Sequence, residues 1–387
     1  MDRLKVATEL FLSYMSLTAE MKAFAEKVGL DVVRVTSAEP LPEAAKRIKE
    51  QIQRGLRPKW KVEDIDSFCD PTSVLSSAKS IVAAAECYLT SEPVDLSKLG
   101  EPHGRIARYL WRNYYHDIKE KLEKVATFLK KRAPGKTKFQ FRCYSNGPLA
   151  QKPIAQQAGV GWYGKNGIIY TEEYGSWIVL GELITNVELE PDEPLEVSCG
   201  NCDACIKACP TKAIIEPYVL DMPRCLQYMT TRQFNMPTHL REIWGNRLYG
   251  CTTCQDVCPL NRKVKPKNRK PTYGYVGSSL PLIPILQMKE KEYRDRFRKN
   301  QIGEWWVRFG AIQRNASIAL GNIRDPVAIP VLTQALNNSR SLMVRIHVAW
   351  ALGKIGGQNT KQALEDALKR ERNPEARKEI KEALDRN

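Results

Sequence analysis

The segments CGNCDACIKACP (199–210) and CTTCQDVCP (251–259), with a lone Cys225 between them, decide the fold of this chain. The first segment has the spacing C-x2-C-x2-C-x3-C-P, and the second repeats it with its first cysteine displaced to position 225. Bacterial ferredoxins with two [4Fe–4S] clusters use this spacing, and the cysteine before each proline binds the other cluster. The spacing therefore predicts two ligand sets, which are Cys199, Cys202, Cys205 and Cys258 for one cluster, and Cys209, Cys225, Cys251 and Cys254 for the other.

Zinc sites and disulfides are the alternative interpretations of these clustered cysteines. Zinc does not require two C-x3-C-P endings, and disulfides are rare in the cytoplasm, where we expect this protein. Two linked clusters conduct single electrons, so another part of the chain is expected to hold the electron acceptor. The three remaining cysteines, Cys69, Cys87 and Cys143, are expected to be buried structural thiols.

Length and composition place the cysteine region between two larger domains. The chain has 387 residues, of which 43% are hydrophobic, and this suffices for two or three domains. No apolar run reaches the roughly 18–20 residues that span a bilayer, and the amino terminus lacks an export signal, so we expect a cytoplasmic protein with no membrane contact. We expect an α/β domain over residues 1–190, a ferredoxin-like double-cluster domain over 191–265 and an all-α domain over 266–387. Within the first, residues 168–170 and 177–184 are expected to form a β-hairpin.

The carboxy-terminal domain contains a repeat. ALGNI (319–323) recurs as ALGKI (351–355), a spacing of 32 residues, and each copy ends one helical pattern and precedes another. A period of roughly 30 residues built from helix pairs is typical of a HEAT-like solenoid. Because two copies are few, an ordinary helical bundle is the alternative. In either case this domain is expected to bind a partner rather than to catalyse.

The positive charge of the chain is concentrated in this last domain. Residues 259–387 carry 26 Lys and Arg against 12 Asp and Glu, a net charge of +14, whereas the first 258 residues carry 34 against 32. Concentrated positive charge favours a polyanionic partner, because counterions released from phosphates drive binding. The candidate nucleic-acid contacts are Arg262, Lys263, Lys265, Lys267, Arg269 and Lys270. A solvated basic linker and, with less support, an anionic membrane surface are the alternatives.

The segment GVGWYG (159–164) matches the glycine fingerprint of dinucleotide sites. That fingerprint lies between a strand and a helix, whereas here a helical pattern (149–158) precedes it and a strand-like segment follows, so we reject a dinucleotide site. Glycines beside Trp162, Lys165 and Asn166 are instead typical of backbone that approaches a large planar ligand. The alternative is a tight loop whose Trp162 packs in the core.

Four segments resemble the epoxyqueuosine reductase (QueG) family, namely AGVGWYGKN (158–166), GSWIVLGEL (175–183), CPTKAIIEP (209–217) and GNRLYGC (245–251). The resemblance implies an α/β domain that binds base-off cobalamin and is similar to reductive dehalogenases, with cobalt reduced through the two clusters. The implied activity is that of an oxidoreductase that removes the epoxide oxygen from epoxyqueuosine at the wobble position of tRNA, which gives queuosine. The cofactor supplies the difficult chemistry, while the protein positions it and delivers protons.

The same resemblance, with the glycine-rich loop, gives the candidate cofactor-binding residues Ser145, Trp162, Lys165, Asn166, Gln227 and Thr252. The family's aspartate, which is implied to donate a proton, falls on Ser145, so this serine is the candidate catalytic residue; a glutamate of the family falls on Gln151. Serine is a poor general acid near neutral pH. Another group such as Tyr109, His116 or Cys143 then replaces the aspartate, or water does, or the substrate differs.

The implied partners are the anticodon stem-loop of tRNA and a low-potential electron donor such as ferredoxin or flavodoxin, and we expect a monomer. Two other hypotheses stay open. A cobalamin and iron–sulfur reductase of the same fold could act on a different substrate, as Ser145 suggests, or the chain could be an electron-transfer or corrinoid-handling protein. Cobalamin absorption bands would separate the enzymes from the last hypothesis, and salt-dependent tRNA binding would separate the first two.

Overall fold

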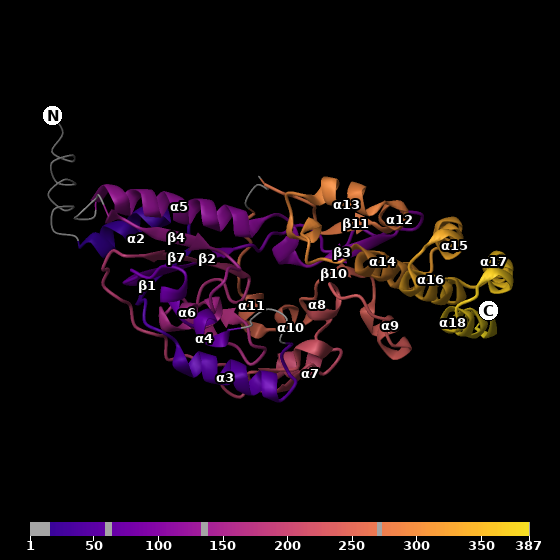
Figure 1. The fold of residues 1–387 in the computed structure, drawn as a ribbon, viewed down its shortest axis with the longest axis horizontal. Helices are drawn as coiled ribbons and strands as arrows, with labels where there is room; N and C mark the ends of the chain where they lie inside the picture. The colour runs from indigo at the N-terminus through magenta and orange to yellow at the C-terminus, as the bar shows by residue number, and fades with distance from the viewer. Residues whose placement is uncertain (1–15, 59–63, 133–137, 269–272, 387) are drawn as a thin grey trace.

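The computed structural model describes residues 16–58, 64–132, 138–268 and 273–386, and Figure 1 shows its elements. The helices are α2 (Leu17–Lys27), α3 (Pro42–Gln53), α4 (Ile65–Phe68), α5 (Tyr114–Arg132), α6 (Gln151–Gln157), α7 (Ala204–Ala208), α8 (Leu226–Met229), α9 (Thr238–Trp244), α10 (Thr253–Asp256), α11 (Pro259–Arg262), α12 (Leu282–Gln287), α13 (Glu290–Phe297), α14 (Phe309–Ile323), α15 (Ile329–Asn338), α16 (Leu342–Ile355), α17 (Gln358–Arg370) and α18 (Pro374–Asp385). The strands are β1 (Val32–Ser37), β2 (Ser80–Cys87), β3 (His103–Ile106), β4 (Phe141–Tyr144), β5 (Trp162–Tyr163), β6 (Ile169–Tyr170), β7 (Ile178–Thr185), β8 (Ile214–Glu216), β9 (Val219–Leu220), β10 (Arg247–Tyr249) and β11 (Ser279–Pro281). Within the described ranges, no helix is both long and apolar enough to cross a membrane.

A four-stranded antiparallel sheet in the order β1-β2-β7-β4 forms the middle of the amino-terminal part. All eight residues of β2 are buried. Helices α5 and α2 lie on one side of the sheet and α6 lies on the other (Figure 1). Gly181 in β7 lets α5 approach closely, because a Cβ atom there would lie 2.8 Å from Leu122. The expected mixed α/β region is therefore present, and its sheet is wholly antiparallel.

The expected β-hairpin of residues 168–170 and 177–184 is wrong. β6 pairs with β5, whereas β7 lies between β2 and β4 in the main sheet. The turn between β6 and β7 is closed by a bridge between Thr171 and Gly175. β7 is almost entirely buried, so it gains more from two neighbours inside a sheet than from pairing with a two-residue strand.

A three-stranded sheet in the order β10-β3-β11 joins segments that are far apart in the sequence. β3 runs parallel to β10 and antiparallel to β11. Ile106, Leu248 and Leu280 from these strands share one apolar core with the carboxy-terminal helices. A short piece of the amino-terminal region thus packs with the later part of the chain, and the domain boundaries at residues 190 and 265 stay predictions.

Helices α14 to α18 form a short solenoid of two layers (Figure 1). α14, α16 and α18 pack in succession in one layer, and α15 and α17 pack beside them in the other. A Cβ atom at Gly321 would lie 2.8 Å from the Cα of Ala351, and one at Gly353 would lie 2.8 Å from the Cα of Ala383. The glycine of each ALG copy therefore allows the next helix of its layer to approach the backbone, which explains the repeat of 32 residues.

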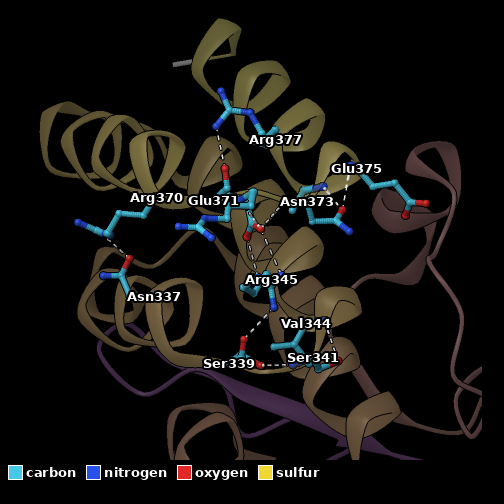
Figure 2. A network of polar contacts seen from close by, with 12 residues as sticks. Asn337, Ser339, Ser341, Val344, Arg345, Arg370, Glu371, Asn373, Glu375 and Arg377 are labelled. Atoms are coloured by element: carbon cyan, nitrogen blue, oxygen red, sulfur yellow. Dashed lines mark hydrogen bonds and ion pairs between the residues drawn. The ribbon is translucent and has the colours of Figure 1, made fainter.

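Arginines tie the turns of the solenoid together, as Figure 2 shows. Arg345 in α16 donates to both carboxylate oxygens of Glu371 and to the carbonyl oxygen of Ser339. Arg377 in α18 donates to the carbonyl oxygen of Glu371 over 2.8 Å. Because these guanidinium groups are used inside the fold, part of the positive charge of this region is not available to an external polyanion.

Candidate double-cluster and cofactor site

The eight motif cysteines lie on loops and short helices, in a region where α7 packs against α10. Cys209 follows the end of α7, and Cys225 and Cys258 directly precede α8 and α11. All eleven cysteines of the chain are free thiols, so the disulfide alternative is excluded.

Cys258 lies with cysteines of the first motif. Burial raises the pKa of the Cys205 thiol, and the neighbouring Cys199 and Cys258 raise it further because negative charges close together repel. Cys258 comes from the second motif, and its position is the one that the ferredoxin spacing predicts for the first cluster. The complete ligand sets stay predictions.

Cys209 lies with Cys225 and Cys251 in a second group. Burial raises the pKa of Cys225, and Cys251 and Cys209 raise it further. Burial also raises the pKa of Cys254, with additional increases from Cys251 and Cys225 and a smaller one from Cys205. Cys205 of the first group is thus near enough to Cys254 of the second to raise its pKa, as expected for two neighbouring clusters that exchange single electrons.

Hydrogen-bond donors surround sulfur atoms of the second group. The amide of Ala213 donates to Sγ of Cys209 over 3.2 Å. Burial raises the pKa of Cys225, and hydrogen bonds from the amides of Gln227 and Tyr228 lower it. Such donors stabilise the thiolate form, and hydrogen bonds to sulfur also set the reduction potential of an iron–sulfur cluster.

Two buried polar groups beside Gly250, the Tyr109 hydroxyl and Gln227 Oε1, have no hydrogen-bond partner among the described residues. A Cβ atom at Gly250 would lie 2.4 Å from Cβ of Ala107, 3.1 Å from Gln227 Oε1 and 3.4 Å from the Tyr109 hydroxyl, so both groups border this glycine. Cys225 is another neighbour of Tyr109. Buried polar groups without partners are rare in native proteins. Their place beside the second thiol group fits a polar cofactor held there.

Glycines of the motif at 159–164 are required by close packing against Tyr170. A Cβ atom at Gly161 would lie 2.0 Å from the Tyr170 carbonyl oxygen, and one at Gly164 would lie 2.3 Å from its ring. Trp162 is buried beside Tyr170 and Cys258. The motif follows α6 and contains β5, which is the reverse of the strand and helix order in a dinucleotide site. The tight-loop interpretation of Trp162 is therefore the one that its contacts favour.

Lys165, Asn166 and Thr252 contact protein groups around the thiols. Lys165 Nζ donates to the carbonyl oxygen of Gly200 over 2.7 Å. Burial raises the pKa of Cys254, and a hydrogen bond with the Asn166 side chain lowers it. The Thr252 hydroxyl donates to a carboxylate oxygen of Asp256 over 2.8 Å. These contacts place the three residues in the protein wall around the cysteines, and their contact with a cofactor stays a prediction.

A buried carboxyl group lies behind the predicted catalytic position. The Ser145 hydroxyl donates to the Leu180 carbonyl oxygen over 2.6 Å, and Gln151 Nε2 donates to the same oxygen over 3.2 Å. Gln151 Nε2 also donates to Glu182 Oε2. Glu182 is 1% exposed, and its Oε1 has no partner among the described residues. Our sequence reasoning missed Glu182, for which the available signal was an acid inside the apolar segment 177–184.

Glu182 makes the stability of the protein depend on pH. Burial raises its pKa to about 8, against a smaller lowering by the Gln151 hydrogen bond. The folded state then binds this proton more tightly than the unfolded state, so the free energy of unfolding falls as pH rises from about 4.5 to about 8. Glu182→Gln removes the titration and keeps an acceptor for Gln151. We expect its melting temperature to exceed that of the parent by on the order of 5 °C at pH 8, with a smaller difference at pH 5.

Thermal denaturation from pH 5 to pH 9 measures this difference. Glu188→Gln is the matched control, because the Glu188 side chain is 84% exposed and forms a surface ion pair with Lys79. A difference between Glu182→Gln and the parent that stays constant across this range would contradict the assignment.

The candidate replacements for the family's aspartate differ in position. His116 stacks on Tyr273 with ring centroids 3.8 Å apart. Cys143 is buried, which raises the pKa of its thiol to about 12. Tyr109 borders Gly250, and burial raises its pKa well above 10, so its hydroxyl keeps the proton at neutral pH. The geometry therefore favours Tyr109 as a proton donor among these three.

Lys152 is a second residue that our sequence reasoning missed. Its side chain is exposed, and the protein groups around the ammonium lower its pKa below the usual value through partial desolvation. Arg57 lowers that pKa as well, whereas Cys225 and Cys254 raise it. Nζ donates to the carbonyl oxygen of Gly167 over 2.8 Å. A lysine side chain thus lies near Cys225 and Cys254 of the second thiol group.

Of the six predicted nucleic-acid residues, Arg262, Lys263 and Lys265 are exposed, whereas Arg269 and Lys270 lie outside the described residues. Lys267 is engaged within the protein. Its Nζ lies 3.1 Å from a carboxylate oxygen of Asp31 and 4.8 Å from the centre of the Tyr174 ring. These contacts argue against Lys267 as a free phosphate contact and leave Arg262, Lys263 and Lys265 as the candidate contacts in the described part of this segment.

Three family models match the chain. Residues 69–146 match epoxyqueuosine reductase QueG, residues 198–261 match a 4Fe-4S double cluster binding domain, and residues 308–385 match HEAT repeats. The expected double-cluster region and the expected HEAT-like solenoid are thereby confirmed, and the alternatives of zinc sites and an ordinary bundle are not supported.

Curated epoxyqueuosine reductases are similar to this chain over nearly its whole length. That of Bacillus subtilis (strain 168) is 34% identical over 378 residues, which cover 97% of each chain. That of Bacillus anthracis is 33% identical over 97% of this chain and 98% of its own. A crystal structure of an epoxyqueuosine reductase with a tRNA-Tyr epoxyqueuosine-modified tRNA stem loop has a TM-score of 0.86 and 34% identity, and covers 95% of this chain and 97% of the other.

Proposed function

This chain belongs to the epoxyqueuosine reductase family, and we propose that it reduces epoxyqueuosine to queuosine in tRNA with the help of cobalamin and two [4Fe–4S] clusters. The reaction consumes two electrons and two protons and releases the epoxide oxygen as water. The observation that carries the proposal is the pair of adjoining thiol groups next to the unpartnered polar atoms of Tyr109 and Gln227. A path for single electrons that ends at a buried polar cofactor needs this combination.

Cobalamin, when bound, supplies a strongly reducing cobalt centre. The eight cysteines are the residues that would hold the clusters, and the amides of Ala213, Gln227 and Tyr228 stabilise the charge on the second thiol group. Tyr109 holds a proton beside Gly250, and because its pKa lies well above 10 it gives up that proton only to a strong base such as an oxygen anion formed nearby.

Ser145 has a structural role in the observed conformation. Its hydroxyl hydrogen is directed to the Leu180 carbonyl oxygen, so it holds the loop that follows β4 rather than presenting a proton to a substrate. In a Bacillus subtilis epoxyqueuosine reductase of TM-score 0.85, a catalytic loop that carries an aspartate is swung out of the active site. In this chain we assign the first proton to Tyr109.

For the partners, we propose the anticodon stem-loop of tRNA and a low-potential donor such as ferredoxin or flavodoxin. The stem-loop is supported by the RNA bound to the related crystal structure. We further propose that the protein acts as a monomer in the cytoplasm, where its tRNA substrate is found. A reductase with the same cofactors and a different substrate is the second candidate, because Ser145 and Gln151 replace two carboxylates of the family pattern.

Conversion of the modified nucleoside tests the proposal. Anaerobically purified protein with clusters and cobalamin would be incubated with a reductant and epoxyqueuosine-containing tRNA, and the nucleosides would be identified by mass spectrometry after digestion. We expect queuosine to form in a reductant-dependent manner. If cobalamin binds normally and epoxyqueuosine is left intact, the second candidate is favoured; failure to bind cobalamin would exclude both.

The basic segment after the clusters gives a further prediction. Replacing Lys263 and Lys265 together with glutamine is expected to weaken tRNA binding and to lower the slope of log K against log salt by about two. Lys267→Gln is expected to leave the slope unchanged and to lower stability instead, because its ammonium group pairs with Asp31. Binding titrations at several salt concentrations measure both, and an unchanged slope for the double variant would make this segment a solvated linker.

A further inference from the structure

Trp305 is an exposed tryptophan on the connection between the short helix Gln301–Gly303 and α14. It is 72% exposed, whereas the other described tryptophans are buried or half-buried. A large indole in water is costly, although a single exposed apolar residue is by itself ordinary. The contacts that hold the loop around Trp305 distinguish it from an ordinary exposed residue.

The loop that carries Trp305 is held in one conformation. The guanidinium group of Arg294 donates to the carbonyl oxygens of Gly303, Glu304 and Val307 over 3.2, 2.6 and 2.8 Å. These bonds fix the backbone on both sides of the indole. The loop is therefore already ordered in the free protein. A partner that binds to Trp305 does not have to offset the conformational entropy of ordering this loop.

Trp306 makes an edge-on ring contact with Trp305 and connects it to the candidate site. The two ring centroids are 5.8 Å apart with an angle of 81° between the planes, and Trp306 packs against the core. Burial raises the pKa of Tyr249, and a hydrogen bond with the Trp306 side chain lowers it. Tyr249 directly precedes Gly250, which borders the unpartnered Tyr109 hydroxyl. A continuous chain of contacts thus leads from the exposed indole to the buried site.

The charge around Trp305 favours an anionic partner. Arg308 is exposed three residues further along and makes no ion pair within the described part of the chain. An ordered aromatic ring together with an exposed guanidinium group three residues away suits single-stranded nucleic acid, because a base can stack on the ring and a phosphate can pair with the cation.

We propose that Trp305 is a stacking platform for an unpaired nucleobase of the tRNA anticodon loop, with Arg308 binding a neighbouring phosphate. This inference rests on the proposed tRNA substrate and adds a specific contact to it. Stacking outside the buried site would hold the loop open and place the adjacent modified nucleoside over Gly250. The platform therefore positions the substrate and takes no part in the chemical step.

Binding of an unmodified anticodon stem-loop to the cluster-loaded protein tests this contact, with fluorescence anisotropy measured at several salt concentrations. Trp305→Ala is expected to weaken binding about tenfold with an unchanged salt slope, whereas Trp305→Phe keeps a stacking ring and should stay within about threefold of the parent. Arg308→Gln is expected to lower the slope by about one. Cross-linking of a loop that contains 5-iodouridine should label Trp305.

Each outcome bears on the platform separately from the reaction. Parental affinity in Trp305→Ala, or a loss accompanied by a lower salt slope, would overturn it, as would a parent protein that binds no stem-loop. If the parent cross-links through Trp305 and leaves epoxyqueuosine intact, the proposed reaction fails while the platform stands. If the reaction proceeds, Trp305→Ala should raise KM for tRNA and leave kcat unchanged. Because Trp305 is exposed, the melting temperature of the Trp305→Ala protein should match that of the parent.

Discussion

Replacing Tyr109 with phenylalanine is expected to lower kcat for epoxyqueuosine reduction about 10²–10⁴-fold, which is the usual contribution of a positioned proton donor. The phenyl ring fills the same space, so iron content should match that of the parent. Cobalamin binding is measured separately, because the lost hydroxyl borders the proposed cofactor site. Without the hydroxyl, the proton must come from solvent, and the remaining activity should rise as pH falls. Single-turnover kinetics at several pH values, together with absorption spectra of the bound cobalamin, measure both effects.

Tyr114→Phe is the matched control for this prediction. Tyr114 is buried, and its hydroxyl donates to the carbonyl oxygen of Tyr88 over 3.2 Å. Loss of that hydrogen bond is expected to cost about 1 kcal/mol of stability and to leave kcat unchanged. Parental kcat in Tyr109→Phe would move the proton donor elsewhere, to water or to the carboxyl group of Glu182.

Short-range spacing explains why the cluster region could be predicted from the sequence. Cys199, Cys202 and Cys205 follow one another within a single loop and turn, so their number and separation already encode the geometry of a cluster. The spacing also predicts that Cys209 and Cys258 each bind the cluster of the other motif, because this exchange belongs to the ferredoxin pattern itself. The solenoid was predictable through the glycines of its two ALG copies.

The third repeat was not visible in the sequence, and the structure shows why. Ala383 lies 32 residues after Ala351 and packs against Gly353 as Ala351 packs against Gly321. In the same register, Asp385 stands where the two earlier copies have glycine. The third copy therefore keeps the alanine that packs against the preceding helix and lacks the glycine, so a search for ALG does not find it.

Long-range contacts account for the rest of what the sequence did not reveal. In the sequence, Lys267 belongs to a basic run. Its ion-pair partner Asp31 lies more than 200 residues earlier, so no local pattern indicates this contact. β3 pairs with strands that no local pattern connects to it. Glu182 sits in an apolar strand, where its burial and its unpartnered oxygen depend on the loop that follows β4. Each of these features is decided by tertiary packing, which local periodicity does not describe.

The crossed ligand sets give a prediction in which two double variants have opposite outcomes. Cys199→Ala with Cys258→Ala removes two ligands of one predicted cluster, so about four irons per chain should remain. Cys251→Ala with Cys258→Ala removes one ligand from each predicted cluster, so iron content should fall well below that of the first variant. Sets that do not cross would reverse this order, because Cys251 and Cys258 would then belong to the same cluster.

Iron analysis and electron paramagnetic resonance of the reduced protein measure these contents directly. Cys143→Ala is the control, since this buried thiol lies outside both groups, and it should retain about eight irons per chain. Both double variants lack Cys258, so any damage to folding from that change is common to them and cancels in the comparison. Reduction of epoxyqueuosine should be lost in both, because an electron path through adjoining groups fails when either cluster is missing. Retained activity in the first variant would mean that the cluster bound by Cys199 is not on the path.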